Sequence, residues 1–132
     1  MIAVGIAMVK AKFDVVLWQE GTTGATPKKV KHKLFENNEA GFQALQRCLA
    51  GQVKNDLHLC MEATNTYGFA LAYFMVAQGY KVSIVNPKQI KAFADSDLKR
   101  NKTDKLDATT IAEFCVQKSP RLWQPATEKM QE

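Results

Sequence analysis

The sequence predicts a single α/β domain in which three antiparallel strands precede parallel strands, with helices packed on a mixed sheet of about five strands. Residues 2–8 and 13–19 are rich in Val, Ile, Phe and Leu on either side of a short polar turn, which predicts a β-hairpin. Further along, an apolar strand, a helix and another strand follow closely, which predicts a parallel crossover. The length of 132 residues suits one hydrophobic core.

The first half of the chain supplies the hairpin, a third strand and a helix. Glycines and a proline within residues 21–27 predict a turn, and the sequence VKHKLF then predicts a strand. Apolar residues recur at helical spacing over residues 42–49. Asn37 or Asn38 is expected to cap this helix, which is expected to end near Gly51.

The second half alternates strands and helices. The segment DLHLCMEA predicts a short apolar strand whose end carries Glu62. Thr66 is a suitable cap for the next helix, which is apolar and is expected to stop at Gly79. The segment KVSIV predicts the following strand, because it is β-branched and stops at Asn86-Pro87.

The remaining residues predict two helices and a domain boundary. Residues 88–101 are polar and basic, which predicts a short helix followed by a loop, and a final helix is expected from Thr103 to about Lys118. The predicted domain covers residues 1–120. Residues 121–132 are expected to begin a linker or helix that leads to a C-terminal region outside this sequence.

The composition predicts an ordinary globular domain in the cytoplasm. Hydrophobic residues make up 46% and charged residues 23%. No membrane partner is expected, because no apolar run approaches the ~20 residues that span a bilayer, and no secretory signal is recognisable. A net charge of +5 fits a polyanionic partner. Cys48, Cys60 and Cys115 are odd in number and widely spaced, which predicts buried thiols.

Three carboxylates stand at positions where open α/β folds usually place their sites. Glu62 ends a predicted strand, and Asp104 and Asp107 open the last helix on one face. Such hard oxygen ligands favour Mg²⁺ or Mn²⁺, and two ions ~4 Å apart would support phosphodiester cleavage. The alternative is structural, with Asp104 as a helix-dipole partner and Glu62 as a surface acid.

Three separated segments carry a resemblance to a known family. In order, GIAMVKAKFDVVLW, CMEATNTYGFAL and VNPKQIKAFADSDLKRNKTDKLDATTIAEF resemble the N-terminal domain of the DEDD transposases of the insertion sequence 110 family, the bridge-RNA-guided recombinases. The resemblance covers about residues 2–125. It implies a RuvC-like domain of the ribonuclease H fold with four metal-binding acids. It also implies DNA and a structured guide RNA as partners, and a dimer or tetramer in the full-length protein.

The resemblance places three of the four acids on this chain. They fall on Glu62, Asp104 and Asp107, whereas the first falls on Ala7 in the sequence Gly-Ile-Ala, where the family has Gly-Ile-Asp. A lost carboxylate lowers metal affinity, so the chain is expected to be inactive. Asp14 is not expected to substitute, because the family carries an acid there too, and it is predicted to be an exposed or turn-proximal strand residue.

Two origins of Ala7 stay open, namely an inactivating substitution and a natural copy that has decayed. The resemblance also implies a serine nucleophile in a C-terminal domain outside this sequence. The fragment is therefore not expected to recombine DNA alone.

Basic residues form two groups. Lysines within residues 28–33 alternate along the third strand, where they fit either a solvated edge strand or a face that binds a polyanion. The second group begins with Lys88 and Lys91 and continues to the start of the acidic helix. The residues of this group that are expected to contact nucleic-acid phosphates are Lys99, Arg100, Lys102 and Lys105.

Aromatic residues and histidines are expected to have structural roles rather than to contact bases or metals. Tyr67 and Phe69 are expected in the core. Trp18 and Trp123 are expected to pack in the core or between domains, and His32 and His58 are expected to be structural.

Two functions from different classes therefore follow from the sequence. The first is the catalytic domain of a metal-dependent DNA transposase or recombinase, disabled at Ala7. The second is a non-catalytic module that binds nucleic acid or dimerises. A nuclease resembling Holliday-junction resolvases is a lesser alternative.

Overall fold

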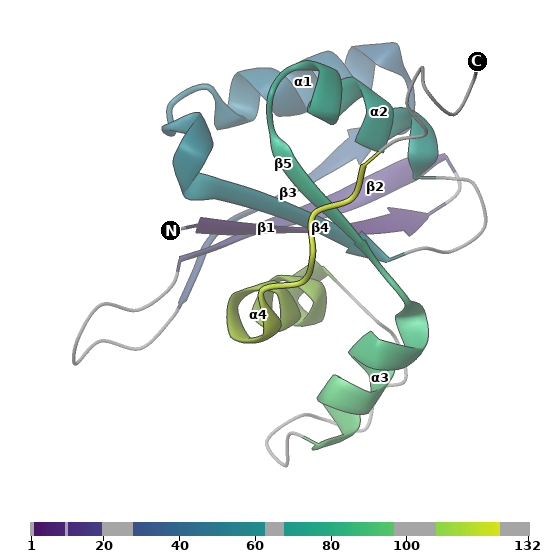
Figure 1. Cartoon of the computed structure of the whole chain (residues 1–132). Coiled ribbons are helices and arrows are strands. Elements are labelled where there is room, and N and C mark those ends of the chain that lie inside the picture. Colours follow the sequence, from purple (N-terminus) through teal and green to yellow (C-terminus); the bar gives the residue numbers. More distant parts are fainter. Residues whose placement is uncertain (1, 10, 20–27, 63–67, 97–107, 125–132) are drawn as a thin grey trace.

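The computed structural model describes residues 2–9, 11–19, 28–62, 68–96 and 108–124 (Figure 1). Within these ranges, five strands form one mixed sheet in the spatial order β3-β2-β1-β4-β5. The first three strands are antiparallel, and the last two run parallel to β1. The predicted α/β class is confirmed. The strands are β1 (Ile2–Val9), β2 (Lys12–Gln19), β3 (Lys28–Glu36), β4 (Leu57–Glu62) and β5 (Lys81–Val85).

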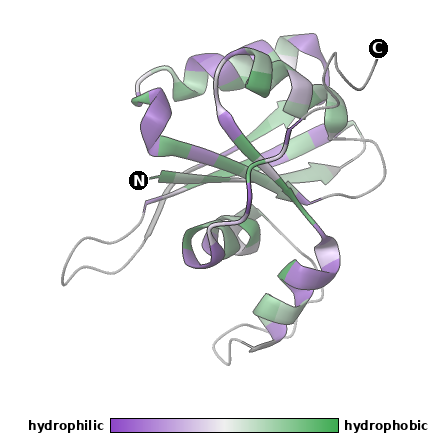
Figure 2. Ribbon diagram, in the orientation of Figure 1, coloured by the Kyte–Doolittle hydropathy of each residue, from purple (hydrophilic) through white to green (hydrophobic). Residues whose placement is uncertain are grey.

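Helices cover both faces of the sheet, and each face has its own core. Figure 1 shows α1 and α2 on one face and α4 on the other, with α3 leading away from the end of β5. Hydrophobic residues are concentrated in the central strands (Figure 2). No helix in the described ranges has the length and apolar composition needed to cross a membrane. The helices are α1 (Glu39–Leu49), the short 3₁₀ turn η1 (Lys54–Asp56), α2 (Phe69–Ala77), α3 (Pro87–Ser96) and α4 (Ala108–Lys118).

Alternation along β1 assigns its side chains to the two cores. Ile6 packs in the core under α1 and α2, whereas Ala7 packs in the core under α4. Gly5 lies on the α4 side as well, and a Cβ atom at this position would meet the carbonyl oxygen of Ala108 and lie 2.6 Å from the backbone nitrogen of Ala112. The backbone of α4 therefore rests directly on β1.

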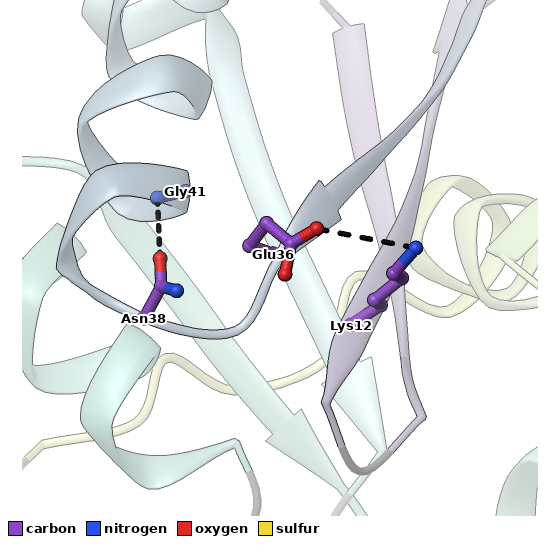
Figure 3. A network of polar contacts seen from close by, with 4 residues as sticks. All are labelled: Lys12, Glu36, Asn38 and Gly41. Atoms are coloured by element: carbon purple, nitrogen blue, oxygen red, sulfur yellow. Dashed lines mark hydrogen bonds and ion pairs between the residues drawn. The ribbon is translucent and has the colours of Figure 1, made fainter.

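The start of α1 is fixed by a side-chain cap. The Asn38 Oδ1 atom accepts a hydrogen bond from the Gly41 N–H at 2.9 Å (Figure 3). Beside it, the Lys12 Nζ and Glu36 Oε2 atoms form an exposed ion pair at 3.9 Å between β2 and β3. Of the two predicted caps, the structure thus selects Asn38. The helix ends at Leu49, two residues before the predicted stop.

We expect Asn38→Ala to lower the free energy of unfolding by about 1 kcal/mol, because it leaves a first-turn N–H without its acceptor. Urea denaturation measures the change. Asn38→Asp keeps an acceptor at the helix N-terminus and should unfold like the parent. Equal midpoints for Asn38→Ala and the parent would show that the cap contributes nothing.

The other predicted helix boundaries are matched in part. Gly68 occupies the N-cap position of α2, and the predicted cap Thr66 lies outside the described residues. After α2, Gly79 has a φ of 93° and leads the chain into β5, which confirms the predicted stop. The predicted start of the last helix at Thr103 lies outside the described residues, and α4 is described from Ala108.

The chain turns back onto β5 after α4, in the segment drawn yellow in Figure 1. Ser119 has a φ of 43°, a left-handed conformation that ends the helix. The Ser83 hydroxyl then donates a hydrogen bond to the Pro120 carbonyl at 3.1 Å, and the Trp123 N–H donates to the Val82 carbonyl at 2.7 Å. Residues on both sides of Arg121 are thereby anchored to β5.

Ser83 also contacts a buried histidine. The His58 Nε2 atom lies 2.7 Å from the Ser83 hydroxyl oxygen, and both side chains are buried. The predicted structural role of His58 agrees with this position. Ser83 therefore joins β4 to the segment that follows α4.

We expect Ser83→Ala to lower the free energy of unfolding by about 2 kcal/mol, because it leaves a buried His58 nitrogen without its partner. Thermal unfolding measures the change. Lys81→Ala, an exposed change on the same strand, should stay within about 0.5 kcal/mol of the parent. If the two variants unfolded alike, the buried link would carry no net stability.

Candidate active site

Strand β4 ends beside β1, close to the carboxyl end of that strand. Their parallel pairing continues as far as Ile6 opposite Met61, so Ala7 and Glu62 are the next residues of the two strands. Met61 packs in the core under α1 and α2, and alternation places Glu62 on the opposite face, where Ala7 packs. Position 7 and Glu62 therefore neighbour each other on the α4 face of the sheet.

Helix α4 starts at this same place. Ala108 belongs to the same core cluster as Ala7, and its carbonyl lies against Gly5. In the sequence, Asp107 directly precedes Ala108. The structure thus brings together position 7, Glu62 and the start of the described part of α4.

The remaining predicted site residues are not placed. Two are acids and four are basic, and all lie outside the described residues. They are Asp104, Asp107, Lys99, Arg100, Lys102 and Lys105.

Asp14 lies directly opposite Ala7 in the antiparallel pairing of β1 and β2. Its side chain is 30% exposed, and its Oδ1 atom lies 2.6 Å from the His32 Nε2 atom. Asp14 is therefore a half-buried strand residue close to the hairpin turn and paired with His32, so of the two predicted positions, exposed or turn-proximal, the structure confirms the second. The spacing of the hairpin could have predicted that Asp14 lies opposite Ala7, because residues equally far from a tight turn pair across it.

A divalent metal ion would need several oxygen ligands on the face of the sheet that carries position 7 and Glu62. Glu62 supplies one carboxylate, whereas Ala7 supplies a buried methyl group that is 7% exposed. Within the described ranges, no group of three or more His, Cys, Asp or Glu side chains could hold a metal ion. Of the four acids that the resemblance implies, the described residues thus include Glu62 alone, and an alanine stands at position 7.

Two buried cysteines, Cys60 of β4 and Cys115 of α4, lie in the core between the sheet and α4. Cys60 and Cys115 are buried and Cys48 is partly buried, and none of them forms a disulfide. The prediction of buried thiols is confirmed for the first two and wrong for Cys48. The hydrogen bond with Cys115 and burial both raise the pKa of the Cys60 thiol, which is therefore neutral at physiological pH.

An aromatic cluster lies on the outer side of α2. The Trp123 ring centroid lies 6.2 Å from that of Phe69 in a stacked arrangement and 5.2 Å from that of Tyr73 in a T-shaped one. Trp123 packs on the domain, as predicted. Phe69 is 36% exposed, so its predicted place in the core is wrong. Trp18 is partly buried against the α4 core, and Tyr67 lies outside the described residues.

Comparison with known sequences identifies relatives over nearly the whole chain. A family model described as a transposase, DEDD_Tnp_IS110, matches residues 4–132. The pilin gene-inverting protein of Moraxella bovis is 37% identical over 132 residues, which cover 95% of this chain and 37% of that protein. The protein of the same name from Moraxella lacunata is 36% identical with the same coverage. The chain thus spans 37% of the length of these curated relatives.

Solved structures show the same fold. Thermus thermophilus RuvC matches with a TM-score of 0.63 and 14% identity, covering 93% of this chain and 100% of that one. T. thermophilus RuvC in complex with a Holliday junction substrate matches with a TM-score of 0.62 and 13% identity, again covering 93% of this chain and 100% of that one. The fowlpox virus resolvase, solved with substrate Holliday junction DNA, matches with a TM-score of 0.51 and 12% identity, covering 90% of this chain and 86% of that one. The predicted RuvC-like fold is confirmed.

Proposed function

Because the chain belongs to the DEDD_Tnp_IS110 family of transposases, we propose that it is the catalytic domain of an enzyme that cleaves and exchanges DNA strands with divalent metal ions. The observation that carries the proposal is the meeting of position 7, Glu62 and the start of α4 on one face of the sheet. The RuvC-like fold supports the same class of reaction.

In this proposal, Glu62, Asp104 and Asp107 hold Mg²⁺ or Mn²⁺, and position 7 lacks the remaining ligand. Glu62 stands at a strand end, and Asp107 directly precedes the residue that packs on β1 beside position 7. The acids would hold metal ions that could supply activation of an attacking oxygen and neutralisation of charge on a phosphate. With a methyl group at Ala7, fewer negative charges hold the ions, and we infer that this chain is inactive.

The proposed partners are DNA and a structured guide RNA. Basic residues between α3 and α4 contact phosphates of these strands, and such contacts position the nucleic acid without reading its sequence. We place the protein in the cytoplasm as a dimer or tetramer when full-length, with residues 1–120 as the RuvC-like domain and 121–132 leading onward. The phosphate-contacting residues in this proposal are Lys99, Arg100, Lys102 and Lys105.

One observation favours a second candidate function. The Ala7 methyl group is buried, and it belongs to the hydrophobic core under α4. A domain that keeps this packing and carries out no chemistry would serve as a nucleic-acid-binding or dimerisation module.

Metal-dependent stability of the 132-residue chain separates these two candidates. Without metal, we expect Ala7→Asp to unfold at lower temperature than the parent, because the new carboxylate would be buried opposite Asp14. Mn²⁺ should reverse the loss, since a ligand at 100 times its Kd stabilises the folded state by about 2.7 kcal/mol. Thermal unfolding with and without Mn²⁺ measures both effects.

Ala7→Asn is the matched control, because it introduces a similar side chain without charge. It should gain little from Mn²⁺, as should the parent. A gain in Ala7→Asn equal to that in Ala7→Asp, or no gain in either, would leave the non-catalytic module as the better account.

A further inference from the structure

A pocket opens at the β5 edge of the sheet, between α3 and α4. Its volume is about 650 Å³, within the range of pockets that hold small ligands. We call it the edge pocket. Its lining includes Val85 of β5, Gln89 and Phe93 of α3, Phe114 and Lys118 of α4, and Arg121 beyond the helix.

One side of the edge pocket is aromatic. The ring centroids of Phe93 and Phe114 lie 5.6 Å apart with their planes at 84°, a T-shaped contact that holds the half-buried Phe93 ring against the buried Phe114 ring. Gln89 lies one turn before Phe93 on α3, so its exposed amide neighbours the same ring. Aromatic rings stack on nucleic-acid bases, and a Gln amide can bond a base edge.

The other side is cationic. Lys118 and Arg121 are both exposed, and within the described residues neither takes part in an ion pair. Arg121 follows Pro120, whose carbonyl is fixed by the Ser83 hydroxyl at 3.1 Å. The left-handed turn at Ser119 separates the two cations and places both on the wall of one pocket. An arginine fork suits the oxygens of a phosphate group.

The edge pocket adjoins the candidate active site. Val85, which lines the pocket, is the pairing partner of Glu62 in the adjacent strand. Neighbouring strands lie about 4.8 Å apart. A nucleic-acid strand that passes Glu62 is therefore within reach of the pocket.

We propose that the edge pocket binds one unstacked nucleotide, with its base against Phe93 and its phosphate on Lys118 and Arg121. The assignment of that nucleotide to a DNA strand rests on the proposed function. The binding of a nucleotide to the pocket does not, because it requires neither a metal ion nor a carboxylate at position 7.

Calorimetric titration of the 132-residue chain in EDTA tests the proposal, with dAMP, AMP, deoxyadenosine and inorganic phosphate as probes. We expect dAMP to bind about tenfold more tightly than phosphate or deoxyadenosine, because it uses both sides of the pocket. The double variant Lys118→Ala/Arg121→Ala should weaken dAMP binding by about tenfold. Phe93→Leu should weaken dAMP binding and leave phosphate binding unchanged.

Lys12→Ala/Lys81→Ala is the matched control, because it removes two exposed cations that do not line the pocket and should leave dAMP binding unchanged. Equal affinities for dAMP and phosphate would overturn the nucleotide site, as would full dAMP binding by Lys118→Ala/Arg121→Ala. Binding of AMP more than about tenfold tighter than dAMP would overturn the assignment to DNA. All of these results are independent of metal binding at position 7.

Discussion

A full-length protein that carries Ala7→Asp should exchange DNA strands in Mg²⁺ about 10³-fold faster than the Ala7 protein. Position 7 lies beside Glu62 on one face of the sheet, so a carboxylate there would complete the proposed set of four acids. Bound metal ions stabilise transition-state charge by several kcal/mol, and each 1.4 kcal/mol changes the rate tenfold. A gel assay of strand exchange, with and without EDTA, measures the change.

Two variants control this experiment. Ala7→Asn should remain inactive, because it lacks the charge, and Glu62→Gln added to Ala7→Asp should abolish the restored activity. If exchange stayed absent in Ala7→Asp while nucleic-acid binding was unchanged, the domain would be a binding module. Cleavage of synthetic four-way junctions without a guide RNA would instead favour a resolvase-like nuclease.

Gly5→Ala should lower the free energy of unfolding by about 3 kcal/mol, the upper end of the usual cost of overpacking. The added Cβ would meet backbone atoms of Ala108 and Ala112, and backbone cannot move aside as a flexible side chain can. Either β1 or α4 must shift. Urea denaturation measures the loss, and Gly51→Ala, where a Cβ meets nothing within 4 Å, is the control.

The same change should also affect the site, because Gly5 sets the distance between β1 and the start of α4. In the Ala7→Asp background, we expect Gly5→Ala to remove the stabilisation by Mn²⁺, even where the domain remains folded. A Gly5→Ala variant as stable as the parent would show that α4 does not rest on β1 as described.

Most of the fold could be predicted because its determinants are local. The hairpin follows from two apolar segments on either side of a short turn, and the end of α2 follows from Gly79, whose φ is positive. The return of the chain onto β5 could not be predicted in this way. It depends on a left-handed Ser119 and on the bond between Ser83 and Pro120, which are far apart in sequence.

The candidate site likewise has parts that the sequence predicts and a part that it does not. Glu62 and position 7 could be identified from their motifs, and the pairing of β1 with β4 explains why they adjoin. The contact between Asp14 and His32 joins residues 18 positions apart on neighbouring strands, so no local sequence pattern predicts it. It depends on the register in which β2 pairs with β3.

We infer that position 7 is an absent metal ligand beside Glu62. Anomalous scattering from crystals of the Ala7→Asp chain, grown with Mn²⁺, tests this claim. We predict a manganese peak between the carboxylates of residue 7 and Glu62, and a weaker peak or none in the Ala7 chain. Absence of that peak in Ala7→Asp, or manganese bound at Asp14 and His32 instead, would contradict the claim.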